Sequence, residues 1–291
     1  MSDPRRHHYL PVFYLKRWLG SDNRLCEFSR PHQIIKPKRK HPSGTAYVTG
    51  LYTIPGVKPE GAEIMEKVFM SAVDNAAATA LTSILSAPDM TDVHNHHKMA
   101  WARFLYSLIM RTPEHLEFAR QKLTEMKPEI VEAERENYPH LRSPTDPETF
   151  DEFKRQFLAN PDNVSPTRYL HRFVSSERIV GHFMGMRWSV ATFENLKFEL
   201  LTSDRPLVMT NGLATPEGHL ALPISPDKIF LACNSAEIEQ SIRAMPINEL
   251  TNVMNTRVVE QARKYVYGTD DAQLRFVRNR FGKQSPSTPL G

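Results

Sequence analysis

The hydrophobic pattern changes from a helical to a strand-like period near residue 186, and this change constrains the fold more than any single motif. Between about residues 60 and 183, apolar side chains recur at steps of three and four, as in helices with one buried face. From about residue 186 to 268, short β-rich runs are separated by turn signals such as Asn211-Gly212. This order predicts an α+β fold, in which a helical middle lobe packs with a C-terminal antiparallel sheet or a partly open barrel.

The chain has the length and composition of one large globular unit. Its 291 residues are 40% hydrophobic and 24% charged, which is ordinary for a soluble protein with a sizeable core. We therefore predict a single two-lobed domain over residues 1–282, followed by a disordered tail over residues 283–291. Residues 127–165 are polar and rich in proline, which favours a mobile excursion or a lid.

Several classes of protein are disfavoured by simple features of the sequence. No uninterrupted apolar run approaches the roughly 18 residues of a membrane-spanning helix, and no apolar segment follows the basic residues near the N-terminus. Cys26 and Cys233 are far apart, which disfavours a disulfide framework and a thiolate zinc site. We expect a cytoplasmic protein with no membrane partner, and the sequence leaves its oligomeric state open.

The basic residues gather in two clusters, although the net charge is only +4. One cluster spans residues 36–40, and the other consists of Arg275, Arg278, Arg280 and Lys283. Each cluster is either a solvated surface or a patch that binds phosphate groups. The second alternative predicts binding that weakens as salt is added.

Residues 6–18 hold the first candidate site. Two adjacent histidines, His7 and His8, are followed closely by Tyr9 and Tyr14. Histidine titrates near neutral pH and commonly acts as a general acid or base. We therefore predict His7 and His8 as catalytic groups and Tyr9 and Tyr14 as substrate-binding groups.

Two charged residues lie on helix faces that are otherwise apolar. Glu66 shares a face with Phe69, where it is either a rim carboxylate near a helix start or a catalytic group. Arg111 extends an aromatic stripe, and a buried arginine needs a carboxylate or a bound anion beside it. Thr112-Pro113 starts the next helix, and a helix N-terminus favours anions. Arg111 is therefore predicted to bind substrate.

Asp204 and Asn255 complete the candidate set. Asp204 lies in a tight corner between two apolar runs, where it either forms an Asx turn or acts as a rigidly held catalytic carboxylate. A helix from residue 247 carries Asn248, Asn252 and Asn255, which are poor helix formers. At least one of them is expected to make a specific bond, and Asn255 is predicted to bind substrate.

Most common catalytic signatures are absent. The sequence contains no dinucleotide-binding glycine fingerprint, no phosphate-binding Walker loop, no zinc-protease helix motif, no nucleophile elbow and no EF-hand loop. The large cofactor-dependent and hydrolase classes that carry them lose support.

The opening run resembles that of a widespread, mostly microbial family of unknown function. Members of that family begin with His-His-Tyr-x-Pro-x-Phe-Tyr-Leu, which here starts at His7, and Trp18 stands where phenylalanine is usual. Its later features follow in order over residues 6 to 268: Glu66, Arg111-Thr112-Pro113, Ser203-Asp204-x-Pro206, Asn255 and Tyr265-Val266-Tyr267. The resemblance supports the candidate residues and implies no activity.

Two functions fit these residues. The first is hydrolysis of a phosphate-bearing substrate, such as nucleic acid or a nucleotide, by a site of histidine, carboxylate and arginine. A divalent metal held by a histidine with Glu66 and Asp204 is compatible with it, although no tight ligand spacing is visible and we favour the metal-independent form. The second is a non-enzymatic module that binds an anion or nucleic acid, with a structural histidine and tyrosine network.

Overall fold

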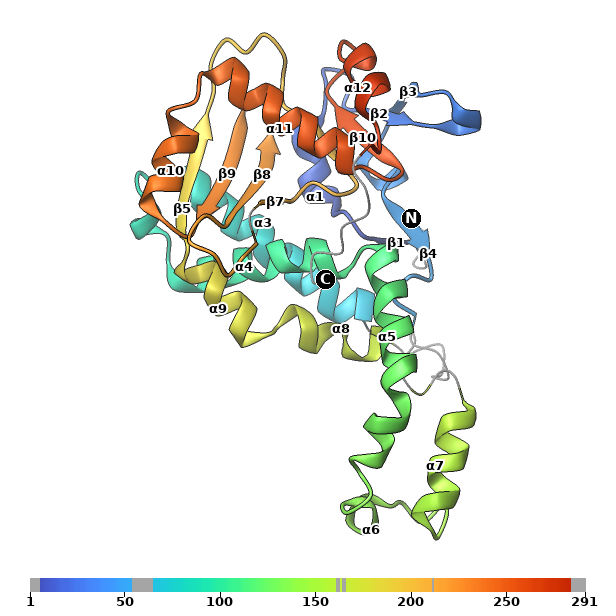
Figure 1. Cartoon of the computed structure of the whole chain (residues 1–291). Helices are drawn as coiled ribbons and strands as arrows, with labels where there is room; N and C mark the ends of the chain where they lie inside the picture. The colour runs from blue at the N-terminus through green and yellow to red at the C-terminus, as the bar shows by residue number, and fades with distance from the viewer. Residues whose placement is uncertain (1–5, 54–64, 161–162, 164–165, 211, 284–291) are drawn as a thin grey trace.

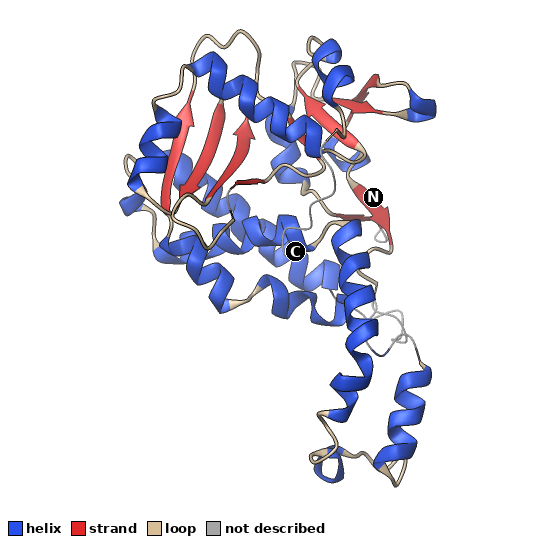
Figure 2. Cartoon of the chain, viewed as in Figure 1, coloured by secondary structure: helices blue, strands red, loops and turns tan. Residues whose placement is uncertain are grey.

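The computed structural model describes residues 6–53, 65–160, 163, 166–210 and 212–283, without the side chains of residues 66, 67, 168 and 169. The fold is α+β, as predicted, and its strands form antiparallel sheets (Figure 1, Figure 2). No sheet in the described part of the chain closes into a barrel. The predicted tail at residues 283–291 lies outside this part, except for Lys283.

A four-stranded sheet organises most of the core, with the strand order β5-β9-β8-β7. Its strands are β5 (Arg187–Thr192), β7 (Val208–Thr210), β8 (His219–Ser225) and β9 (Lys228–Cys233). Side chains of Trp188 and Phe230 point from one face into the core formed with α3 (Ser71–Ser86), α4 (Asn95–Met110) and α9 (Glu177–Gly185). Ile229 and Leu231 point from the other face toward α10 (Ala236–Arg243) and α11 (Ile247–Gln261). The sheet is therefore covered on both faces, which explains its nearly continuous apolar strands.

A second four-stranded sheet joins the two ends of the chain, with the order β3-β2-β10-β6. Its strands are β2 (Leu25–Ser29), β3 (Lys36–Lys40), β6 (Thr202–Ser203) and β10 (Tyr265–Gly268). Cys26, Phe28 and Val266 pack from one face against α12 (Leu274–Arg280) and the end of α11. The strand-rich half therefore divides between two sheets, and its last strand pairs with the N-terminal hairpin.

The opening segment is fixed to both sheets by buried hydrogen bonds. It consists of β1 (Arg6–His8), which pairs with β4 (Tyr47–Thr49), and α1 (Val12–Leu15), which continues into a short 3-10 turn (Lys16–Trp18). The Tyr14 hydroxyl donates to the carbonyl of Pro223 in β8 at 2.7 Å and lies 2.7 Å from the hydroxyl of Thr202 in β6. Trp18 Nε1 donates to the carbonyl of Leu200, just before β6, at 2.9 Å. Other short 3-10 turns are Pro31–Gln33, Pro42–Gly44 and Met90–Asp92.

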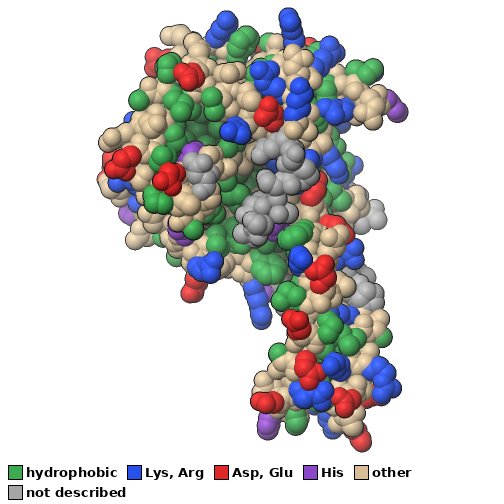
Figure 3. Space-filling view, viewed as in Figure 1, with side chains coloured by type: hydrophobic (Ala, Val, Ile, Leu, Met, Phe, Trp, Pro, Cys, Tyr) green, Lys and Arg blue, Asp and Glu red, His purple; other side chains and the backbone are tan. Residues whose placement is uncertain are grey.

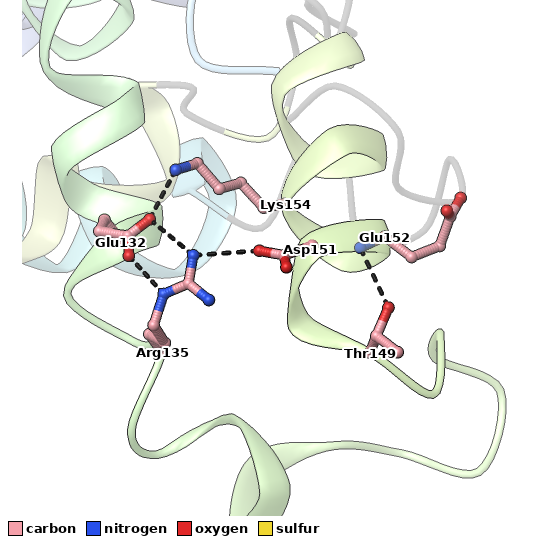
Figure 4. A network of polar contacts seen from close by, with 6 residues as sticks. All are labelled: Glu132, Arg135, Thr149, Asp151, Glu152 and Lys154. Atoms are coloured by element: carbon pink, nitrogen blue, oxygen red, sulfur yellow. Dashed lines mark hydrogen bonds and ion pairs between the residues drawn. The ribbon is translucent and has the colours of Figure 1, made fainter.

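The polar segment after residue 113 forms a helical arm that projects from the body (Figure 1). The arm contains α5 (Pro113–Glu132), α6 (Tyr138–Leu141) and α7 (Phe150–Ala159), and α8 (Pro166–Val174) follows it. Arg135 joins the helices, because it bonds Glu132 at the end of α5 and Asp151 in α7, while Lys154 also reaches Glu132 (Figure 4). Much of the predicted excursion is therefore helix.

One helical stretch, Val68–Ser86, is long and apolar enough to cross a membrane by length and composition. Its first three residues are the end of the π-helical turn Met65–Met70, and the rest is α3. Val73, Ala77, Ala80, Leu81 and Ile84 pack into the core beside α4. Core helices pass the same test, so this feature is weak evidence for a membrane span.

Candidate functional site

His7 is held inside the fold by Tyr52. The backbone N–H of Tyr52 donates to His7 Nδ1 at 2.8 Å, and the two rings stack with centroids 5.4 Å apart and planes 4° apart. Both side chains are fully buried. Because Nδ1 accepts a hydrogen bond, the neutral ring carries its proton on Nε2. His7 therefore has a structural place in the fold, whether or not it also takes part in chemistry.

The hydroxyl of Tyr52 joins the opening strand to the junction between α4 and α5. It lies 3.1 Å from the carbonyl oxygen of Arg111 and 3.4 Å from that of His8. The predicted residues His8 and Arg111 are therefore neighbours in space, although about a hundred positions separate them in sequence.

Arg111 is completely buried and has only part of its hydrogen-bonding capacity satisfied within the described residues. Nη1 donates to Oδ1 of Asp74 at 2.8 Å, which confirms the expected carboxylate partner. The guanidinium carbon lies 5.6 Å from the centre of the Phe104 ring. Nε and Nη2 are buried and have no hydrogen-bond partner among the described residues. These donors point to a site that an anion would complete, since unmade hydrogen bonds of a buried charge are costly.

The start of α5 lies beside this arginine. Thr112 is the N-cap of the helix, with its hydroxyl accepting from the backbone N–H of His115 at 3.3 Å, and Pro113 is the first helical residue, as predicted. The free N–H groups and the dipole of a helix N-terminus favour negative charge. The local backbone thus adds to the positive potential around Arg111.

His8 supplies an imidazole nitrogen without a partner. The residue is half-buried, and its Nε2 atom is buried with no hydrogen-bond partner among the described residues. Burial lowers the pKa of His8, a backbone group of Ser43 raises it, and the positive charge of Arg111 lowers it further. The ring is therefore neutral at pH 7 and able to accept a proton.

Tyr9 contributes a third buried polar atom of the same kind. Its hydroxyl has no hydrogen-bond partner within the described part of the chain, and 3% of the residue is exposed. Burial raises the pKa of Tyr9, and the negative charge of Asp204 raises it further. The hydroxyl thus stays protonated at neutral pH and can donate a hydrogen bond to a ligand.

Asp204 lies near Tyr9, but its carboxylate is engaged by the backbone. Oδ1 accepts from the N–H of Arg263 at 2.9 Å, and Oδ2 accepts from the N–H groups of Lys264 at 2.6 Å and Tyr265 at 3.3 Å. Burial raises the pKa of Asp204 to about 6, with the amide bonds acting in the opposite direction. Its geometry holds the start of β10 and places negative charge beside Tyr9.

A further ion pair connects the Asp204 corner to α5. Arg205 lies 3.4 Å from the carboxylate of Glu114 in the first turn of that helix. Asp204 and Arg111 therefore lie on the same side of the molecule, because Asp204 adjoins Arg205 and Arg111 is three residues before Glu114. The structure brings together His8, Tyr9, Arg111 and Asp204 around the entry to α5.

The other predicted site residues are placed differently. Tyr14 uses its hydroxyl on Pro223 and on the Thr202 hydroxyl, both at 2.7 Å. Asn255 accepts from the N–H of Leu201 at 2.8 Å and donates to the carbonyl of Glu199 at 2.9 Å, so its expected specific bond is to the fold itself. The side chain of Glu66 lies outside the described residues. Over those residues, no three His, Cys, Asp or Glu side chains are grouped to hold a metal ion.

A family model described as Protein of unknown function (DUF4238) matches residues 6–272. The chain belongs to the DUF4238 family. No curated protein and no solved structure gives a significant match to it. In this DUF4238 protein, the matched region contains every candidate residue as well as both four-stranded sheets.

Sequence reasoning missed three residues that shape the site of this DUF4238 protein. Tyr52 follows a loop rich in glycine and proline, and no local pattern distinguishes it. Asp74 had a usable signal, because Ala77 and Leu81 follow it at steps of three and four on the buried side of α3. Glu114 looked like an ordinary acidic residue in a first helical turn, and its pairing with Arg205 depends on tertiary structure.

Proposed function

We propose that this DUF4238 protein is a hydrolase of a phosphate-bearing substrate, that is, a nuclease or a nucleotide hydrolase. The observation that carries the proposal is the set of unpartnered polar atoms His8 Nε2, Tyr9 Oη, and Arg111 Nε and Nη2, all buried within the described region. A lone structural arginine would be expected to have its donors satisfied. A bound phosphate group supplies the missing acceptors for Tyr9 and Arg111, and a water molecule donates to His8 Nε2.

In this proposal Arg111 binds two phosphate oxygens through Nε and Nη2, which form one edge of the planar guanidinium. Arginine suits this task because its donors match the spacing of phosphate oxygens. Asp74 holds the opposite side of the group through Nη1. The N-terminus of α5 adds a favourable potential, and Tyr9 donates a further hydrogen bond.

His8 is the general base. Its neutral Nε2 takes a proton from a water molecule, the oxygen of that water bonds to phosphorus, and the bond from phosphorus to the leaving oxygen breaks. The leaving oxygen then takes a proton from the protonated imidazole or from solvent. A positioned base of this kind contributes roughly 100- to 10,000-fold to a rate. His8 and Tyr47 are half-buried and Arg6 is exposed, so this side of the cluster faces solvent.

The test is hydrolysis by the pure full-length protein of single- and double-stranded RNA and DNA and of nucleotides, each with added magnesium and with a chelator. We expect cleavage of at least one substrate, and a rate at least 100-fold lower for His8→Ala. His140→Ala is the matched control, because His140 is exposed on α6 of the arm. Equal inertness of wild type and His8→Ala across the panel overturns the proposal, and the chelator reveals whether a divalent metal takes part.

The second candidate is a non-enzymatic module that binds an anion or nucleic acid. The buried pair of His7 and Tyr52 favours it, because this pair rigidifies the opening strand without leaving Nδ1 free. In that case His8→Ala lowers the melting temperature and no substrate is cleaved. Binding of phosphate without turnover would select this candidate.

A further inference from the structure

The excess of basic over acidic residues is confined to the part of the chain built on the sheet β3-β2-β10-β6. Residues 20–45 and 263–283 contain twelve Lys and Arg and four Asp and Glu, whereas the rest of the chain has 25 basic and 29 acidic residues. Lys and Arg side chains gather around α12 in this lobe, while charges of both signs alternate on the arm (Figure 3). The two basic clusters of the sequence thus belong to one small part of the fold.

The strand register separates these clusters onto the two faces of the sheet. Lys36 pairs with Ser29 and Lys38 pairs with Glu27, and these partners pair in turn with Tyr265 and Tyr267 of β10. Directly paired residues share a face, so these lysines lie on the side of the tyrosines. The opposite face carries Cys26, Phe28 and Val266 beneath α12. Lys40 follows Lys36 and Lys38 at the same alternation, and all three lysines are exposed or half-buried.

The face with the lysines leads to the candidate site. Tyr267 lies 2.9 Å from the hydroxyl of Thr45, and the next residue, Ala46, accepts from the N–H of Tyr9 at 3.0 Å. Tyr47 follows, with its ring 5.6 Å from that of His8 and 4.9 Å from the guanidinium carbon of Arg6. Tyr265 is half-buried and lies within electrostatic reach of Tyr47. Lysines and accessible tyrosine rings therefore continue from the sheet edge to His8.

We infer that this face binds single-stranded nucleic acid and leads it to the candidate site. Alternate residues of a strand are about 6.7 Å apart, so Lys36, Lys38 and Lys40 form a row spaced like successive phosphates of one nucleic-acid strand. Aromatic rings beside such a row, here Tyr265 and Tyr47, serve as stacking surfaces for bases. The lysine row lies along a single edge strand, β3, and one row of charges suits an extended strand better than a duplex.

The charges around the lysine row favour a polyanion. Glu27 is the acidic residue on the same face of the sheet, and it is buried, with its carboxylate bonded to Thr45. Arg39 pairs with Asp22 on the other face. Lys36, Lys38 and Lys40 have no ion pair with any described residue. Their charge is therefore available to phosphates.

The inference that this face leads nucleic acid to the catalytic groups rests on the proposed function. Binding itself can be measured in the absence of catalysis. The experiment is fluorescence anisotropy of labelled single-stranded RNA and DNA oligonucleotides with the full-length protein in chelator, between 50 and 200 mM salt. The variant Lys36→Gln/Lys38→Gln/Lys40→Gln is compared with Arg275→Gln/Arg278→Gln/Lys283→Gln. The second variant removes the same charge from α12 and from Lys283, which follows it, on the opposite face of the sheet. Circular dichroism checks that both variants fold.

We expect wild type to bind and the lysine variant to bind at least tenfold more weakly, with the slope of log affinity against log salt reduced by about 2, because each lost phosphate contact removes about 0.7. The α12 variant should keep most of its affinity. Equal losses in both variants, tighter binding of duplex, or binding to vesicles of anionic lipid without binding to oligonucleotides overturns the inference. Binding without cleavage defeats the hydrolase proposal alone, whereas cleavage of nucleotides without oligonucleotide binding defeats this inference alone.

Discussion

Arg111 donates from Nη1 to the carboxylate of Asp74 at 2.8 Å. Its other two side-chain nitrogens, Nε and Nη2, are buried and reach no acceptor among the described residues. Asp74 lies in α3 and Arg111 directly follows α4, and the packing of these two helices forms part of the core. This pair fixes the guanidinium while leaving one of its edges free. The predictions below follow from that arrangement and from the groups around it.

Asp74→Asn should lower the free energy of unfolding by about 2–4 kcal/mol, because it leaves a buried guanidinium without its counter-charge. Urea unfolding measures this change. Glu117→Gln is the matched control, since it removes the exposed ion pair with Arg120 on α5 and should change stability little. Similar effects of the two substitutions would show that the pair of Asp74 and Arg111 contributes no more to stability than an exposed ion pair.

Tyr52→Phe should lower stability by about 1 kcal/mol and weaken anion binding, because the lost hydroxyl joins the backbones of Arg111 and His8. The phenylalanine ring of this variant still stacks on His7. Tyr138→Phe removes a comparable bond, to the carbonyl of Pro147, on the distant arm. It should leave anion binding unchanged, and a matching loss of binding in both variants would refute a specific role for Tyr52.

Stability should fall as the pH is lowered through about 6.5, in part because of His8. Its pKa is lowered in the folded state, so the unfolded chain binds the proton more readily in this range and acid favours unfolding. Urea unfolding at pH 7 and pH 5 should show a larger loss for wild type than for His8→Gln. Parallel profiles would contradict the assignment of a depressed pKa to His8.

Asp204→Ala should destabilise the protein by about 3 kcal/mol or more, because three backbone N–H groups at the start of β10 lose their acceptor. The loss should appear in urea unfolding even when no ligand is present. Asp227→Ala is a useful comparison, as that carboxylate is bonded by side chains of Ser225 and Lys228 at a strand turn. An unchanged unfolding free energy for Asp204→Ala would argue for a purely catalytic residue.

Local patterns were enough to predict many elements. Alternation and turn residues placed short strands between about residues 186 and 268, where β5 to β10 lie, and Thr112-Pro113 located the start of α5. The expectation that Arg111 meets a carboxylate is confirmed, because the cost of burying an unpaired arginine applies in any fold.

Local sequence patterns could not predict which distant segments pair with each other. β10 joins β2 and β6, and this choice depends on which apolar faces meet in the folded chain. Asn255 is a second example. Because asparagine is a poor helix former, its position in a helix predicted a specific bond, but the sequence did not indicate that the partners are Glu199 and Leu201. Tyr52 gave no signal at all, because its role comes from a loop held against β1 and Arg111.

Titration calorimetry with inorganic phosphate tests most directly whether the buried cluster around Arg111 takes up an anion. We predict one phosphate bound per chain by wild type and by Arg120→Lys, whose substituted side chain is exposed on α5. Arg111→Lys should bind at least tenfold more weakly, because an ammonium group cannot donate from two fixed nitrogens. Equal affinity of Arg111→Lys and wild type, or no binding by wild type, would contradict the account.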